Sequence, residues 1–308
     1  MRIAAIADLH FSEERRARAE AIAGAVASAR ADVLVIAGDC ADGVEHLADA
    51  LALFGEFGGV RLMVPGNHDL WQDTTPFDTR RLYEETIPAI AAEYGFHCLD
   101  SGPLVIDGTC FVGAMGWYDY QMRQRETPVE GITVSPIHVS RGEAGKMHFS
   151  SLPDARETGW EALEPRDYAA NGLVWQTNGE RPQVAVWSDP LHLDWGETSE
   201  RLAAEMAARI RAQIRELADG CRRVVGVTHF VPFAELASHH LQSPRRAYAK
   251  AFLGSPLLGE ALLAADNLAL VIHGHRHRQE ARRLHGIVVA DAAVTGAQDG
   301  PLLFTLPD

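Results

Sequence analysis

The stretch "VRLMVPGNHDLW" (residues 60–71) joins a short apolar run to a cluster of polar side chains. The run at 60–64 is typical of a buried strand, and Gly66 then allows the backbone to turn tightly. Asn67, His68 and Asp69 follow at once. Packing seldom requires an amide, an imidazole and a carboxylate at the end of a strand, so this cluster indicates chemistry.

The same arrangement recurs at the ends of four other apolar runs. These runs are "AAIADLH" (4–10), "VLVIAGD" (33–39), "VVGVTH" (224–229) and "LVIHGHRH" (270–277). The polar residues that they deliver are Asp8 and His10, Asp39, His229, and His275 and His277. In open α/β sheets the C-terminal strand ends line one crevice, where ligands bind. We therefore expect five separate segments to converge on one site.

Strand and helix signals alternate over most of the chain. Helical patterns at 13–30, 44–57, 78–94 and 199–218 lie between the strands, which favours an α/β fold with a mostly parallel sheet covered on both faces. "PLVIDGTCFVGAMG" (103–116) predicts a hairpin around Asp107 and Gly108, and short strands are expected near 279–284, 286–290 and 301–306. Residues 117–195 break the pattern and contain five of the six tryptophans. We expect one domain over 1–308, with a loop-rich insertion or cap at about 117–195.

Composition restricts the function classes. The 308 residues carry a net charge of −14, which argues against a broad nucleic-acid surface or an anionic membrane surface. No stretch approaches the ~18 apolar residues of a membrane span, and the N-terminus is typical of a first strand rather than a signal peptide. The four cysteines form no CxxC pair, so a disulfide framework is not expected. These features predict a soluble cytoplasmic protein.

The polar residues at the strand ends are suited to binding metals. Carboxylate, imidazole and carboxamide groups bind Mn²⁺, Fe²⁺ and Zn²⁺, and the lack of cysteine among them argues against a thiolate zinc site. Seven candidate ligands exceed what one ion requires. Two divalent ions that share one carboxylate, at the ~3.5–4 Å separation of two-metal hydrolases, would use all seven.

The ordered set of motifs resembles the calcineurin-like metallophosphoesterase superfamily. The resemblance covers residues 8 to 277 but says little about 117–195. It implies a four-layer α/β sandwich, with central mixed β-sheets flanked by helices. It also implies one metal held by Asp8, His10, Asp39 and His277, and a second held by Asn67, His229 and His275 with Asp39 bridging both. His68 would then face the substrate, with Asp69 orienting it.

These parts predict the hydrolysis of a small phosphoester. Two cations lower the pKa of a bridging water, so that hydroxide attacks phosphorus in line with the leaving oxygen, and His68 stabilises charge or protonates the leaving group. A phosphodiester is favoured. A phosphomonoesterase with the same site is the alternative, and a non-catalytic scaffold on this fold is a further one. The substrate, the metal identity and the oligomeric state are not predicted.

Three residues outside the ligand set are candidates for contact with the substrate. Trp117 and Asp119 follow a predicted strand directly, and Arg276 lies between two proposed ligands. Aromatic side chains at this position could stack on a planar group. Alternatively, the tryptophans form a small core within the insertion, Arg276 points outward, and Asp69 caps the following helix.

Overall fold

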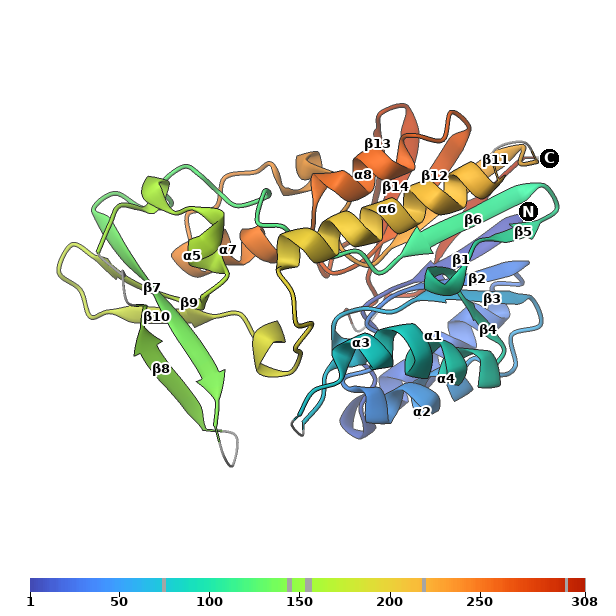
Figure 1. Ribbon diagram of the computed structural model, residues 1–308. Helices are drawn as coiled ribbons and strands as arrows, with labels where there is room; N and C mark the ends of the chain where they lie inside the picture. Colours follow the sequence, from blue (N-terminus) through green and yellow to red (C-terminus); the bar gives the residue numbers. More distant parts are fainter. Residues whose placement is uncertain (74–75, 143–145, 153–156, 218–219, 297–298, 308) are drawn as a thin grey trace.

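The computed structural model describes residues 1–73, 76–142, 146–152, 157–217, 220–296 and 299–307 (Figure 1). A first sheet carries the N-terminal motifs, in the strand order β15-β1-β2-β3-β4. Its strands are β1 (Arg2–Ile6), β2 (Val33–Ala37), β3 (Val60–Val64), β4 (Phe96–Cys98) and β15 (Leu302–Thr305). All neighbours pair in parallel except β15, which runs antiparallel to β1. The strands predicted at the first three motifs are confirmed.

A second sheet carries the C-terminal motifs, in the order β13-β14-β12-β11-β6-β5. Its strands are β5 (Leu104–Ile106), β6 (Thr109–Ala114), β11 (Arg223–Thr228), β12 (Leu268–His273), β13 (Gln279–Leu284) and β14 (Ile287–Ala292). The four inner strands are parallel, and antiparallel β5 and β13 close the edges. The β5–β6 hairpin turns at Asp107 and Gly108, as the sequence predicted.

The two sheets pack face to face through one apolar layer, and helices cover their outer faces. The shared layer includes Ile3 and Val35 of the first sheet and Val225 and Ile272 of the second. Figure 1 shows the first sheet covered by α1 (Arg16–Ser28), α2 (Leu47–Ala52), α3 (Thr79–Arg81) and α4 (Ile87–Glu93), and the second by α6 (Ser199–Leu217) and α8 (Pro256–Leu262). This arrangement is the four-layer sandwich that the resemblance implied. It contains two central sheets, whereas the strand pattern alone suggested one. Across the described ranges, every helix falls short of the length or the hydrophobicity that a membrane crossing requires.

The insertion has more regular structure than the sequence indicated. It holds an antiparallel sheet in the order β10-β9-β7-β8, with α5 (Pro165–Tyr168) beside it and α7 (Pro244–Ala249) nearby (Figure 1). Its strands are β7 (Ile132–Arg141), β8 (Met147–Ser151), β9 (Asn171–Thr177) and β10 (Gln183–Val186). The first half of β7 buries Val134 in the main core, whereas the second half buries Val139 against Leu191. Because the buried face changes along the strand, β7 shows no single alternation in the sequence.

One disulfide joins Cys110 to Cys221, whose Cα atoms lie 5.8 Å apart. The sequence predicted no disulfide framework, so this bridge was not expected. The two cysteines are 111 residues apart, and only the parallel pairing of β6 with β11 brings them together. Cys40 and Cys98 are free and buried. Disulfides persist mainly in oxidising compartments. The bridge therefore argues against a cytoplasmic location, which stays a prediction.

Two glycines allow the motif loops to approach buried carboxylates. A Cβ built on Gly66 would lie 2.8 Å from Cγ of Asp39, and one on Gly274 would lie 2.5 Å from Oδ2 of Asp8. Real Cβ atoms essentially never approach non-bonded atoms so closely. Only glycine therefore allows the loops after β3 and β12 to pack against these two side chains.

We predict opposite effects on stability for two Gly→Ala substitutions. G274A should lower the free energy of unfolding by about 1–3 kcal/mol, because its methyl group displaces Asp8. G24A, inside α1 with nothing within 4 Å, should raise it by about 0.5–1 kcal/mol. Urea denaturation of the metal-free proteins measures both changes. A G274A protein as stable as the wild type would contradict the close approach.

Candidate metal centre

Five strand ends meet at one edge of the sandwich, where the loops of the two stacked sheets come together. The first sheet contributes side chains from the loops after β1, β2 and β3, and the second sheet contributes those after β11 and β12. These loops bring together all seven residues that the sequence singled out as ligands, namely Asp8, His10, Asp39, Asn67, His229, His275 and His277.

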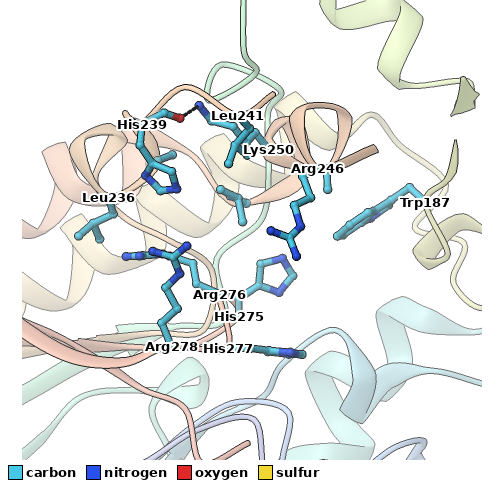
Figure 2. Close-up of a pocket in the computed structure, with 13 residues that line it drawn as sticks. Trp187, Leu236, His239, Leu241, Arg246, Lys250, His275, Arg276, His277 and Arg278 are labelled. Atoms are coloured by element: carbon cyan, nitrogen blue, oxygen red, sulfur yellow. Dashed lines mark hydrogen bonds between the residues drawn. The ribbon is translucent and has the colours of Figure 1, made fainter. Parts of the chain in front are cut away.

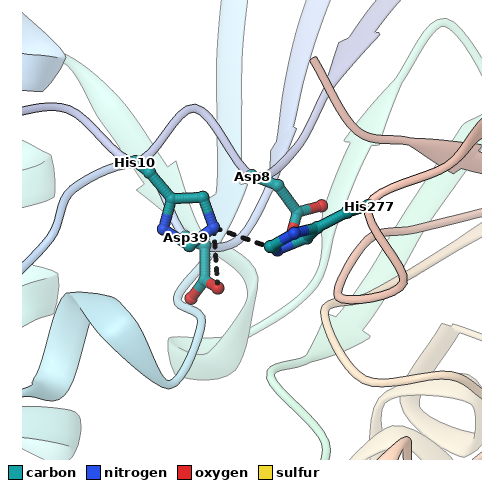
Figure 3. Close-up of side chains that lie close together, drawn as sticks. All are labelled: Asp8, His10, Asp39 and His277. Carbon is teal, nitrogen blue, oxygen red and sulfur yellow. Dashed lines mark hydrogen bonds and ion pairs between the residues drawn. The ribbon is translucent and has the colours of Figure 1, made fainter. Parts of the chain in front are cut away.

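A first group consists of Asp8, His10, Asp39 and His277 (Figure 3). One ligand atom from each of these side chains lies within 4.8 Å of the others. Nε2 of His10 is 3.1 Å from Nε2 of His277 and 3.7 Å from Oδ2 of Asp39. His277 also lies 3.3 Å from Oδ1 of Asp8. Two imidazoles and two carboxylates thus point at one small volume.

A second group consists of Asp39, His229 and His275, whose ligand atoms also lie within 4.8 Å of one another. Nε2 of His229 is 3.3 Å from Oδ2 of Asp39 and 3.2 Å from Nδ1 of His275. The amide oxygen of Asn67 lies 3.1 Å from the same Nε2 atom. Asp39 is 1% exposed and belongs to both groups, so its carboxylate is placed to bridge two ions.

The donor set fits divalent cations. In each group two imidazole nitrogens face each other at 3.1 or 3.2 Å, so that a proton or a cation must lie between them. Burial lowers the pKa of His229, but the charges of Asp39 and Asp8 raise it to about 9, whereas burial and the charge of His229 lower the pKa of His275 to about 3. The two histidines therefore share one positive charge between carboxylates, and a metal ion would take its place by displacing the proton.

The backbone at these residues adopts a conformation that side chains usually avoid. Five of the seven candidate ligands have a positive φ, from 48° to 69°: Asp8, His10, Asp39, His275 and His277. The left-handed region costs non-glycine residues roughly 1–2 kcal/mol each. Such strain persists only where the surroundings impose it, and it clusters at functional sites. Here it turns the side chains of successive loops toward one point.

His68 lies at the mouth of this centre, and its ring is held on two sides. Nδ1 of His68 hydrogen-bonds to Oδ1 of Asp42 at 3.0 Å, and the ring stacks on Trp71 at 3.7 Å between centroids. The same Asp42 oxygen contacts Nδ1 of His10 at 2.7 Å. Burial lowers the pKa of His68, but Asp39 and the bond to Asp42 outweigh it and raise that pKa above its ordinary value.

The sequence-based expectation that Asp69 orients His68 differs from this geometry. Both carboxylate oxygens of Asp69 accept backbone N–H groups, from Ala41 and Gly66, at 2.8 Å each. The 3-10 turn at His68–Leu70 directs Asp69 back toward the loop, where it ties the motifs after β2 and β3 together. Asp42 orients His68 instead, and the second aspartate in "GDCAD" (38–42) was the only signal for it in the sequence.

Asp189 of the insertion reaches the centre and was not predicted. It is 2% exposed and accepts hydrogen bonds from Nδ2 of Asn67 at 2.8 Å and from the indoles of Trp71 and Trp187 at 3.0 and 2.9 Å. Because Asp189 binds the amide nitrogen of Asn67, the amide oxygen is left to face His229. In the sequence, an aspartate before Pro190 signals only a turn.

A crevice of about 210 Å³ opens over the centre. Its described lining includes Asp39, Asn67, His68, Trp71, Trp187, Asp189, His275 and His277. Trp117 and Asp119, proposed as substrate contacts, are each 2% exposed and hold the fold together. Trp117 donates to Oγ of Ser199 at 3.2 Å, and Asp119 accepts from Oγ of Ser255 at 2.6 Å. Arg276, the third candidate, lines a cavity beside the crevice.

A family model for calcineurin-like phosphoesterases matches residues 1–279. The chain belongs to this family. It is accordingly a metal-dependent phosphoesterase, and the family implies a binuclear divalent metal centre, for which the groups of Asp and His side chains around Asp39 are candidates.

Comparison with one solved structure supports the fold. A phosphopantetheinyl hydrolase from Mycobacterium tuberculosis is 19% identical, with a TM-score of 0.61 over 95% of this chain and 88% of that one. A dimetal phosphatase from Danio rerio is 11% identical, with a TM-score of 0.47 over 98% of this chain and 90% of that one. No curated protein sequence matches the chain.

We predict that Asp42 positions His68 and His10. D42A should lower kcat by about 10- to 100-fold, the usual effect of removing a carboxylate that orients a ligand or catalytic histidine. Steady-state kinetics after metal loading, with the metal content of each sample, measure the effect. D49A, which removes an exposed carboxylate from α2, is the matched control and should leave kcat within about twofold of the wild type. A D42A enzyme with unchanged kcat and metal content would contradict this role.

Proposed function

We propose that the chain hydrolyses phosphodiesters with two divalent ions bound at this centre. Asp8, His10, Asp39 and His277 would hold one ion. Asn67, His229 and His275 would hold the other, with Asp39 bridging. Mn²⁺, Fe²⁺ and Zn²⁺ suit this mixture of oxygen and nitrogen donors. The observation that carries the proposal is the burial of one carboxylate, Asp39, between two clusters of imidazoles.

When bound, the two ions supply an activated water and neutralise charge on the phosphoryl oxygens. The residues of the chain then orient the substrate and handle protons. Nδ1 of His68 is held by Asp42, so Nε2 is left for the substrate in the crevice. The raised pKa of His68 increases the protonated share of the ring over that of an ordinary histidine, and a protonated ring can donate to the departing oxygen.

The space around the centre supports a diester over a monoester. The crevice of about 210 Å³ holds little more than a phosphoryl group and part of one substituent. It adjoins a larger cavity of about 420 Å³, and the two share Trp187, His275 and His277 in their linings. A phosphodiester has two substituents and would use both spaces. Phosphomonoester hydrolysis at the same centre is the alternative, since the crevice alone accommodates a monoester.

The test is hydrolysis of a bis-aryl phosphodiester and of the corresponding aryl monoester by metal-loaded protein. We expect a higher kcat/KM for the diester, and a loss of at least about 100-fold in D39N, because that substitution removes the bridging charge. D107N, at the exposed turn of the β5–β6 hairpin, is the matched control and should keep full activity. A phosphopantetheinyl ester belongs in the same panel, because the similar Mycobacterium tuberculosis protein is a phosphopantetheinyl hydrolase.

Two results would count against the proposal. A higher kcat/KM for the monoester would assign the centre to a phosphatase. Turnover that D39N retains would show that the reaction does not use this centre. Separate samples are loaded with Mn²⁺, Fe²⁺ and Zn²⁺, so that a lack of turnover with one metal is not mistaken for a lack of activity.

A further inference from the structure

A cavity of about 420 Å³ lies directly beside the metal crevice (Figure 2). Its walls come from α7, from the segments that precede and follow α7, from the loop after β12 and from Trp187. Trp187, His275 and His277 line both spaces, so a group in this cavity would lie next to a phosphoryl group at the metal centre. Figure 2 shows Arg246 of α7 pointing toward the ring of His275, with Trp187 beside it.

The charge of the cavity is opposite to that of the chain. The whole sequence has 42 acidic and 28 basic residues. The cavity is lined by Arg246, Lys250, Arg276 and Arg278, and none of its described lining residues is a carboxylate. Burial and the charges of Arg278, Lys250 and Arg276 hold the pKa of His239, also in the lining, below its ordinary value. Four cations gathered in one concave place form a site for an anion.

Arg276 provides an independent indication of a ligand. Its side chain is only 5% exposed, and Nη2 donates to Glu280 at 2.8 Å. Nη1 is buried and has no hydrogen-bond partner within the described part of the chain. A buried guanidinium donor without a partner is costly, and an anionic oxygen would satisfy it. Lys250 is 7% exposed and donates to the carbonyl oxygen of His239 at 2.9 Å, which leaves two further N–H donors.

We propose that this cavity binds a second anionic group, a phosphate or a group of like charge, carried by the substrate that is cleaved at the metal centre. The inference rests on the proposed function and specifies its substrate class: a phosphodiester with a phosphate on one substituent. Trp187 separates the two phosphate positions. Its indole stacks on Phe252 at 4.4 Å and bonds to Asp189, so it forms a fixed wall along which the connecting part of the substrate lies.

Two esters that differ by one phosphate test the proposal. They are thymidine 5′-(4-nitrophenyl phosphate) and the same compound with a 3′-phosphate. We expect the wild type to prefer the 3′-phosphorylated ester, and both R246Q and R278Q to reduce the ratio of the two kcat/KM values by about tenfold, the worth of one charge-assisted hydrogen bond. R245Q, at the exposed neighbouring position on α7, is the matched control and should keep the wild-type ratio.

Binding of pyrophosphate to metal-free protein, in the presence of a chelator, tests the cavity without catalysis. Isothermal titration should show binding to the wild type and to R245Q, and a Kd about tenfold weaker for R246Q and R278Q. Arg246 and Arg278 are both exposed, so these substitutions do not disturb the core. Arg276 is not substituted, because it lies between two proposed ligands.

The two experiments separate the possible failures. If both esters are cleaved with equal kcat/KM, the anion site is wrong while the phosphodiesterase proposal stands. If neither ester is cleaved with any metal, the phosphodiesterase proposal fails and the titration alone decides the cavity. In that case weaker pyrophosphate binding by R246Q supports the anion site, and identical binding by R246Q and R245Q overturns it.

Discussion

The carboxylate of Asp39 is the group on which the rest of the centre depends. Oδ1 accepts the backbone N–H of His68 at 2.9 Å, and Oδ2 lies 3.3 Å from Nε2 of His229. The first contact joins the loops after β2 and β3, and the second crosses to the other sheet. Gly66 makes room for this side chain, because any Cβ there would meet it. One buried charge thus sets both the spacing of the sheets' loop ends and the position of the candidate ions.

The insertion contributes side chains that support the metal centre. Asp189 fixes the amide of Asn67 and both neighbouring indoles, while the ring of His192 stacks on Trp71 at 4.4 Å. Trp71 in turn supports His68. The segment at 117–195 therefore stabilises the orientation of a candidate ligand and of the candidate proton donor. The same segment supplies Trp187, which lines both the crevice and the neighbouring cavity that holds Arg246, Lys250, Arg276 and Arg278, here called the cationic cavity.

The sequence alone predicted the strands that carry the motifs and the seven residues that converge at their ends. These predictions depend on local patterns, namely apolar runs of five or six residues, glycine turns and polar residues directly after them. What it missed depends on contacts distant in sequence. Asp42 rather than Asp69 contacts His68, because a 3-10 turn directs Asp69 toward the backbone of Ala41. Trp117 follows a strand as expected, but it is buried because α6 and Phe230 cover it.

The cationic cavity could also not be predicted from the sequence. Arg246 and Arg276 are 30 residues apart in the sequence, and the charged residues around each of them form no pattern that indicates a site. Only the fold places α7 opposite the loop after β12, so that their positive charges face a common space. The net charge of the chain gave no sign of it. Local charge at a site and total charge are separate quantities, and only the first bears on the substrate.

Anomalous diffraction from crystals loaded with Mn²⁺ tests whether the centre is binuclear, because it locates each ion. We expect two ions about 3.5–4 Å apart on either side of the Asp39 carboxylate. One would lie among Asp8, His10 and His277, and the other among Asn67, His229 and His275. A single ion, or two ions that do not share Asp39, would contradict the binuclear centre.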